Sequence, residues 1–200
     1  LWAFGDVFVV NVSSPNTPNL RELQDDEGLV RILSHCKAVN LQCSETHGSA
    51  PKPVLVKVAP DMTDEQLIHI AQTARANGAD GMVVSNTTVE RPTSAIGKDL
   101  SVFQETGGMS GRPLRKRSTE MIATVRRATA PDWPIIGVGG ISGADDAWEK
   151  IRAGATLVQA YSGFVFEGPA LTKMVVHGLA KRLAQSGFST VEEAVGTAPA

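Results

Sequence analysis

Five short apolar runs, rich in β-branched residues, recur along the chain and alternate with segments whose apolar residues follow helical spacing. Runs of this length with few polar residues are typical of parallel strands that are buried on both faces. The strands that they predict are Val7–Val12, Val54–Val58, Gly81–Ser85, Pro134–Val138 and Thr156–Ala160. Strands that alternate with helices predict an α/β fold with a parallel sheet.

The segments between these strands carry helix start and stop signals. Thr63 and Gln66 have the spacing of a capping box, and Gly78 provides a stop for the helix that follows them. Ser118 is expected to cap a second helix. Further helices are predicted over Leu29–Val39, over Asp145–Ala153 and from about Pro169 onward. The polar stretch Leu41–Lys52 is predicted to be a surface loop.

Polar residues or glycines lie at or directly after the C-terminal end of every predicted strand. They are Asn11, Lys57, Asn86, Gly139–Gly140 and Tyr161–Ser162. A doubly wound sheet concentrates its site at one switch point, whereas a (β/α)8 TIM barrel builds its site from many strand ends. We therefore predict a TIM barrel. Because such a barrel typically takes about 250 residues, we expect residues 1–200 to be a single domain that is an incomplete barrel, with roughly its last five β/α units.

Composition narrows the possible partners. The chain has 200 residues, 42% hydrophobic and 20% charged, with a net charge of -2, which predicts a globular protein and no nucleic-acid partner. Its two cysteines are too few for a disulfide framework and fit a reducing compartment. A zinc site is not predicted, because the nearby histidines and cysteines lack the usual ligand spacing. These residues are His35, Cys36, Cys43 and His47.

Two glycine-rich loops are candidates for binding an anion. Gly137–Gly143 follows a strand and precedes a helix, where free backbone N–H groups favour an anion. Ser142 stands where the dinucleotide fingerprint requires a third glycine, so a phosphate site of late barrel loops is the favoured interpretation. A glycine turn needed only for close packing remains the alternative. Thr106–Gly111 ends a long loop, and such loops are often functional.

Other strand ends carry side chains that suit a polar ligand. Asn11–Thr17 offers amides and hydroxyls, although a turn held by its own side chains is an alternative. Lys57 interrupts an apolar strand, so it requires a charged partner or an anionic ligand. The amide of Asn86 suits a flat, amide-rich ligand such as a pyrimidine. Neither Ser13 nor Ser14 lies in the elbow motif of hydrolase nucleophiles.

Several motifs occur together in a set order along the chain. They are Asn11–Thr17, Val54–Pro60, Ser85–Thr88, Glu105–Gly111, Ile136–Gly140, Lys150–Gly154 and Leu157–Gln159. As a set they resemble class 2, quinone-dependent dihydroorotate dehydrogenase, over the region from Val7 to about Gly196. The resemblance implies a TIM barrel that holds FMN, oxidises (S)-dihydroorotate to orotate in pyrimidine biosynthesis and passes the electrons to a quinone.

The resemblance also implies roles for single residues. Ser14 matches the catalytic base, and a serine at this position points to class 2 because class 1 enzymes carry cysteine there. Serine is a poor base unaided, so we expect Thr17 to hold a relay water. The residues implied to bind substrate are Asn11, Ser14, Pro15, Asn16, Asn86 and Thr87. The residues implied to bind FMN are Asn11, Lys57, Ser85, Ser110, Gly111, Gly139, Gly140, Tyr161 and Ser162.

The same resemblance implies partners and a location. The partners are dihydroorotate and ubiquinone, and membrane association is expected through an N-terminal segment outside this chain. The location is the mitochondrial inner membrane, which the polar stretch Leu41–Lys52 favours, or the cytoplasmic face of a bacterial inner membrane. Two alternatives remain open. The chain could be a catalytically incompetent fragment with exposed strand edges, or an FMN-dependent pyrimidine oxidoreductase of another class.

Overall fold

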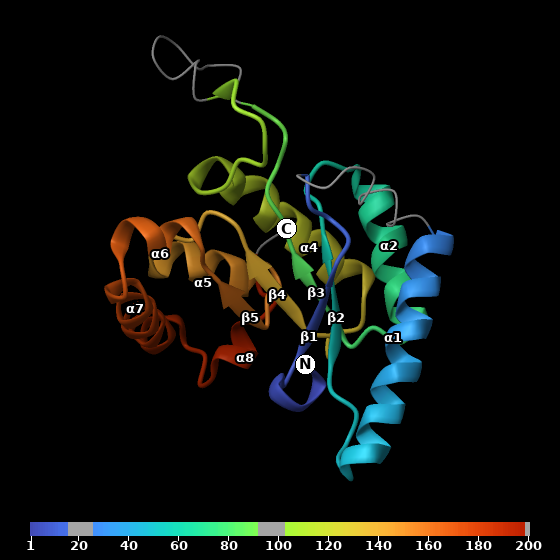
Figure 1. Ribbon diagram of the computed structural model, residues 1–200. Coiled ribbons are helices and arrows are strands. Elements are labelled where there is room, and N and C mark those ends of the chain that lie inside the picture. Colours follow the sequence, from blue (N-terminus) through green and yellow to red (C-terminus); the bar gives the residue numbers. More distant parts are fainter. Residues whose placement is uncertain (16–25, 92–102, 199–200) are drawn as a thin grey trace.

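One parallel sheet forms the centre of the molecule (Figure 1). The computed structural model describes residues 1–15, 26–91 and 103–198. Five strands lie side by side in the order β1-β2-β3-β4-β5, and all neighbours are parallel. They are β1 (Phe8–Asn11), β2 (Val54–Val58), β3 (Gly81–Val84), β4 (Ile135–Val138) and β5 (Leu157–Gln159). Each observed strand lies within its predicted span, which confirms the strand pattern and the α/β class.

Helices connect the strands and cover one side of the sheet (Figure 1). Two 3-10 turns, η1 (Trp2–Phe4) and η3 (Arg112–Leu114), precede β1 and α4. The α-helices are α1 (Asp26–His47), α2 (Asp64–Ala76), α4 (Arg115–Ala128), α5 (Ala144–Ala153), α6 (Ser162–Glu167), α7 (Ala170–Ser186) and α8 (Val191–Ala194). α1 and α2 lie beside β1 and β2, whereas α5, α6 and α7 lie at the other end of the sheet (Figure 1).

The local start signals of the helices are partly confirmed. Thr63 Oγ1 accepts from the Gln66 N–H and Gln66 Oε1 accepts from the Thr63 N–H, which completes the capping box of α2. The prediction that Ser118 caps a helix is wrong, because α4 begins at Arg115 and Ser118 is buried in its first turn. The turn η3, which contains Pro113, starts the helical conformation earlier than the cap signal suggested.

α1 is longer than predicted. It continues to His47, so the first part of the expected loop over residues 41–52 is helical. The ring of Trp2 lies 5.0 Å from the ring of His47, and Trp2 Nε1 donates to Asn40 Oδ1 at 2.8 Å. Tertiary contacts of this kind stabilise a polar helix that its own sequence only weakly favours.

The two faces of the sheet differ. Val54, Val56 and Val58 of β2 point into the main core, where they pack with residues of α1, α2 and α4. The opposite face has only a small cluster around Leu55, Val83, Val138 and Ile136. Val9 and Leu157, on the two outermost strands, are 46% and 59% exposed. Helices on one face and an open second face are the arrangement that an incomplete barrel presents.

Gly137 of β4 lies against the core with no space for a Cβ atom. A Cβ atom at this position would lie 2.9 Å from both Ala155 Cβ and Ile122 Cδ1. We expect Gly137→Ala to lower the free energy of unfolding by about 1–3 kcal/mol, because the core there has no space for a methyl group. Urea denaturation measures this change. Gly143→Ser is the matched control, since its surroundings are open and its backbone is extended; equal effects of the two changes would contradict the prediction.

Candidate active site

A network of amide and hydroxyl groups joins the ends of β1 and β3. Asn11 Oδ1 accepts from Ser13 Oγ at 2.8 Å and from Asn86 Nδ2 at 3.2 Å. Asn86 Nδ2 also donates to Ser13 Oγ at 3.0 Å, and Asn86 Oδ1 accepts from the Thr87 N–H at 2.8 Å. Ser13 is fully buried. Sequence analysis selected Asn11 and Asn86 but missed Ser13, whose place in the network depends on a residue of another strand.

The predicted substrate loop begins directly after this network. Ser14 and Pro15 are partly buried. A Cβ atom at Gly108 would lie 2.9 Å from Pro15 Cγ and closer still to Thr87 Oγ1, so Gly108 is enclosed between these two residues. Three segments of the chain therefore meet here, and Gly108 is a position that sequence analysis did not select. Outside the described residues lie Asn16 and Thr17.

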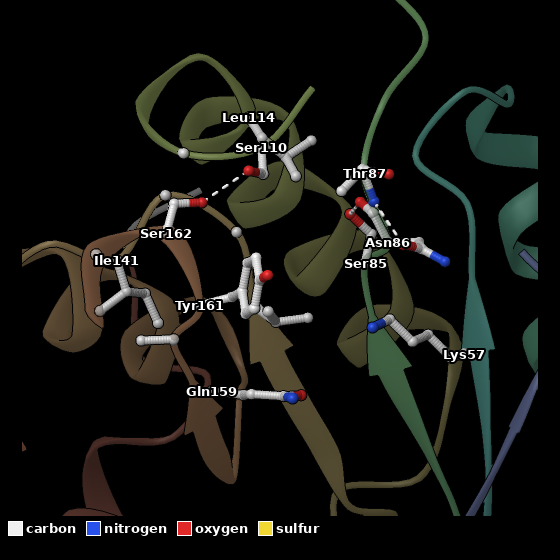
Figure 2. A pocket seen from close by; sticks show the side chains of 16 residues that line it. Lys57, Ser85, Asn86, Thr87, Ser110, Leu114, Ile141, Gln159, Tyr161 and Ser162 are labelled. Atoms are coloured by element: carbon white, nitrogen blue, oxygen red, sulfur yellow. Dashed lines mark hydrogen bonds between the residues drawn. The ribbon is translucent and has the colours of Figure 1, made fainter. Parts of the chain in front are cut away.

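Lys57 provides a cation beside the network. It is in register with Asn11 of β1 and with Val83 of β3, and it lines the cavity shown in Figure 2. Burial of its ammonium group lowers the pKa of Lys57 below the ordinary lysine value. Within residues 1–15, 26–91 and 103–198 no carboxylate forms an ion pair with Lys57. A partly buried cation of this kind suits an anionic ligand.

The cavity of Figure 2 has a volume of about 260 Å³ and lies at the C-terminal ends of β2, β3, β4 and β5. It brings together most of the residues predicted for the cofactor, namely Lys57, Ser85, Ser110, Gly111, Gly139, Gly140, Tyr161 and Ser162, with Asn86 and Thr87. Asn11 is not a lining residue and reaches the site through Asn86. The lining residues not selected as site residues from the sequence are Leu114, Val138, Ile141, Gln159, Ala160 and Gly163. Two of them had a signal: Ile141 lies in the glycine-rich loop Gly137–Gly143, and Gln159 is the last polar residue of a predicted strand.

One end of the cavity is built from backbone and hydroxyl groups. Gly139 and Gly140 have φ values of +127° and +71°, and a Cβ atom at Gly140 would lie 2.8 Å from Arg115 Cα. Side chains are therefore excluded, and only the backbone can line this end. Ser110 Oγ and Ser162 Oγ, which also line the cavity, lie 2.7 Å apart (Figure 2). Groups of this type bind phosphate oxygens.

The long loop after β3 returns to the cavity by backbone contacts. Thr88 and Met109 exchange two backbone hydrogen bonds, at 3.1 and 2.7 Å. The hydroxyl of Thr88 also donates to the carboxylate of Asp61. The guanidinium group of Arg91 donates to the carbonyl oxygens of Thr88, Val89, Glu90, Phe103, Glu105 and Gly107. These contacts place Gly108 and Ser110 against the strand ends.

Comparison with known proteins decides the family. The family model for dihydroorotate dehydrogenase matches residues 1–183. The chain belongs to the dihydroorotate dehydrogenase family. The dihydroorotate dehydrogenase (quinone) of Synechococcus elongatus is 45% identical over 202 residues, which cover 99% of this chain and 51% of the relative. The corresponding protein of Christiangramia forsetii is 49% identical over 173 residues, or 86% of this chain and 48% of the relative.

Solved structures of the dihydroorotate dehydrogenase family have the same fold. The crystal structure of the Eimeria tenella dihydroorotate dehydrogenase in complex with ferulenol superimposes with a TM-score of 0.88 at 36% identity. The match covers 97% of this chain and 54% of that one. The chain therefore spans about half the length of the curated relatives that it matches. These findings confirm the resemblance and the barrel-type α/β fold inferred from the sequence.

Asn86→Asp tests whether the network joins β1 to β3. The change removes the N–H groups that bind Asn11 and Ser13, and it places a carboxylate against an amide oxygen. We expect a loss of about 1–3 kcal/mol in the free energy of unfolding, measured by urea denaturation at neutral pH. Asn86→Ala, which removes the donors without adding a charge, should cost less. Unchanged stability of Asn86→Asp would show that the network does not form.

Proposed function

We propose that this chain is the C-terminal half of a quinone-dependent dihydroorotate dehydrogenase, and we call that longer protein the parent enzyme. The proposed reaction is the oxidation of (S)-dihydroorotate to orotate in pyrimidine biosynthesis. One observation carries the proposal. The network of Asn11, Ser13 and Asn86 lies at the same sheet edge as Lys57 and a cavity walled by glycine backbone. Family membership and the names of the relatives support it.

The residues of the cavity fit FMN. Gly139 and Gly140 lie against α4 with no room for a Cβ atom, so their backbone lines the cavity, and the hydroxyls of Ser110 and Ser162 line it as well. A phosphate group suits this end, and the positive charge of Lys57 suits the flavin ring, which becomes anionic when it is reduced. Bound FMN would supply the acceptor for the hydride of the substrate, whose two electrons the quinone would then receive. The residues proposed to hold it are Asn11, Lys57, Ser85, Ser110, Gly111, Gly139, Gly140, Tyr161 and Ser162.

The amides beside the cavity suit the substrate. Asn11 and Asn86 have donors and acceptors that match the edges of a pyrimidine ring and its carboxylate. Ser14, directly after the network, is proposed to take the proton from C5 of dihydroorotate, with Thr17 holding a relay water. Proton removal by a serine requires such a relay because its hydroxyl is a weak base. The residues proposed to bind substrate are Asn11, Ser14, Pro15, Asn16, Asn86 and Thr87.

The names and organisms of the relatives support proposals about the electron acceptor and the location of the parent enzyme. Their names support a quinone as the electron acceptor. Cyanobacterial relatives are 45% identical to the chain, whereas the Eimeria tenella enzyme is 36% identical. We therefore propose the cytoplasmic face of a bacterial inner membrane instead of the mitochondrial inner membrane. In the described residues no helix is long and apolar enough to cross a membrane. Contact with the membrane remains a proposal about the parent enzyme.

The chain without the rest of the parent enzyme is a separate case. Within the described residues, β1 and β5 each pair with one neighbour, and the open face of the sheet exposes Val9 and Leu157. Such edges tend to pair with other strands. The isolated chain is therefore proposed to be catalytically incompetent while the parent enzyme is active. No observation favours a flavin-dependent pyrimidine oxidoreductase of another class, because the names of the relatives specify a quinone.

Ser14→Ala in the parent enzyme tests the proposed reaction. The change removes the proposed base but none of the hydrogen bonds between Asn11, Ser13 and Asn86. We expect oxidation of dihydroorotate to fall at least a hundredfold while FMN stays bound, in line with the usual contribution of a general base. Quinone-coupled turnover and flavin absorbance measure the two quantities. Turnover at the wild-type rate would remove Ser14 from the mechanism.

Lys57→Met in the parent enzyme tests whether this lysine lies beside the flavin ring. Methionine keeps most of the apolar stem but has no charge, so it should no longer stabilise the anionic reduced form. We expect flavin reduction by dihydroorotate to slow at least tenfold, as followed by rapid-mixing absorbance. Lys173→Met, on the exposed surface of α7, is the matched control and should change nothing. Identical rates for both variants would place Lys57 away from the flavin.

A further inference from the structure

Lys150 is a buried lysine that the proposed chemistry does not use. It lies on α5 and has no exposed surface. Burying an ammonium group is costly unless its N–H groups find acceptors. Its Nζ atom lies 2.5 Å from Ser118 Oγ, 3.1 Å from Thr119 Oγ1 and 3.4 Å from the Arg115 carbonyl oxygen. All three acceptors belong to the first five residues of α4, and they match the three N–H groups of an ammonium.

Ser118 links Lys150 to the glycine-rich loop Gly137–Gly143. Its Oγ atom lies 3.0 Å from the carbonyl oxygen of Arg115 and 3.2 Å from that of Gly139. A hydroxyl has only one proton to donate. The Arg115 carbonyl oxygen already accepts from Lys150 Nζ and from Thr119 Oγ1, so we assign the proton of Ser118 to the Gly139 carbonyl oxygen, 3.2 Å away. A continuous chain of hydrogen bonds thus runs from Lys150 to Gly139.

The bond to the Gly139 carbonyl orients an N–H group of the cavity wall. This carbonyl and the Gly140 N–H belong to one planar trans peptide, so they point in opposite directions. The carbonyl points inward to Ser118. The Gly140 N–H therefore points away from Ser118, and both Gly139 and Gly140 line the cavity. An N–H group directed in this way is suited to an anion.

A second set of contacts holds the other end of the same loop. Arg115 Nη1 lies 2.6 Å from Asp146 Oδ1, and Asp146 Oδ2 accepts from the Ser142 N–H and from Ser142 Oγ, both at 2.9 Å. The loop is thus attached to α4 and α5 at Gly139 and at Ser142. The hydrogen bond of Lys150 to Ser118 belongs to the attachment at Gly139.

We propose that Lys150 is a positioning residue for phosphate binding, which acts through Ser118 to orient the Gly139–Gly140 peptide toward the phosphate of FMN. This inference rests on the proposed function and assigns the phosphomonoester, not the flavin ring, as the group that Lys150 serves. Burial lowers the pKa of Lys150 to about 8, and the neighbouring Glu149 and Asp146 limit this decrease. At neutral pH the ammonium form with its three donors therefore predominates.

The test compares FMN with riboflavin, which has the same ring system but no phosphate. Both dissociation constants are measured by flavin fluorescence on the parent enzyme freed of its cofactor. We expect Lys150→Met to weaken FMN binding about tenfold or more, because the loss of one good hydrogen bond to an anion raises the dissociation constant by about this factor. Riboflavin binding should change by less than about twofold. Ser118→Ala should weaken FMN binding to a similar extent. The double variant should weaken it little further than either single variant, because both residues belong to one hydrogen-bond network.

Arg126→Met is the matched control. Arg126 lies on α4, the helix that carries Ser118. Its charged side chain donates hydrogen bonds to the carbonyl oxygens of Gly154, Ala130 and Pro131 and none to Gly139. Arg126→Met should lower stability without changing the ratio of FMN to riboflavin affinity. Equal losses for the two ligands in Lys150→Met and Ser118→Ala would overturn the inference and leave a purely structural lysine, and so would wild-type affinities. A wild-type parent enzyme that binds neither flavin would instead overturn the proposed function. If Lys150→Met fails to fold, the FMN and riboflavin dissociation constants of Ser118→Ala test the inference.

Discussion

The parallel register of the five strands is the constraint on which the site depends. Because the strands run in one direction and pair in sequence order, their C-terminal ends meet at one edge. Asn11 pairs with Lys57, Lys57 pairs with Val83, and the Ser85 N–H donates to the Val138 carbonyl oxygen. Residues separated by more than a hundred positions thus face one cavity. A shift in any strand would move a polar side chain from this edge into the apolar core.

The site also depends on places where no side chain fits. Gly108 is enclosed by Pro15 and Thr87, and Gly139 and Gly140 lie against the first turn of α4. At these positions the backbone itself forms the wall, with N–H groups whose direction is set by peptide planarity and not by a rotamer. The start of α4 lies behind the loop and keeps those N–H groups directed at a ligand. We propose that Lys150 holds this part of α4 in place through Ser118.

The open face of the sheet relates the chain to its longer relatives. Helices cover one side, whereas the side that carries Lys57 has a small apolar cluster and exposed outer strands. In a closed barrel this side would be the interior, filled by residues of strands from both halves. On the proposed function, the chain contains the catalytic and phosphate-end residues and depends on the remainder of the parent enzyme for a complete site.

The sequence by itself determined the strands, the capping box at Thr63 and the glycine loops, because strand hydrophobicity, helix caps and glycine turns are local properties. The motifs also identified the family and most of the residues that line the cavity. Only the tertiary structure decided that Ser118 binds Gly139 instead of capping a helix, that α1 extends to His47 beside Trp2, and that Ser13 joins two strand ends. Each of these depends on a partner distant in the sequence, and a local pattern contains no information about which distant group a side chain will meet.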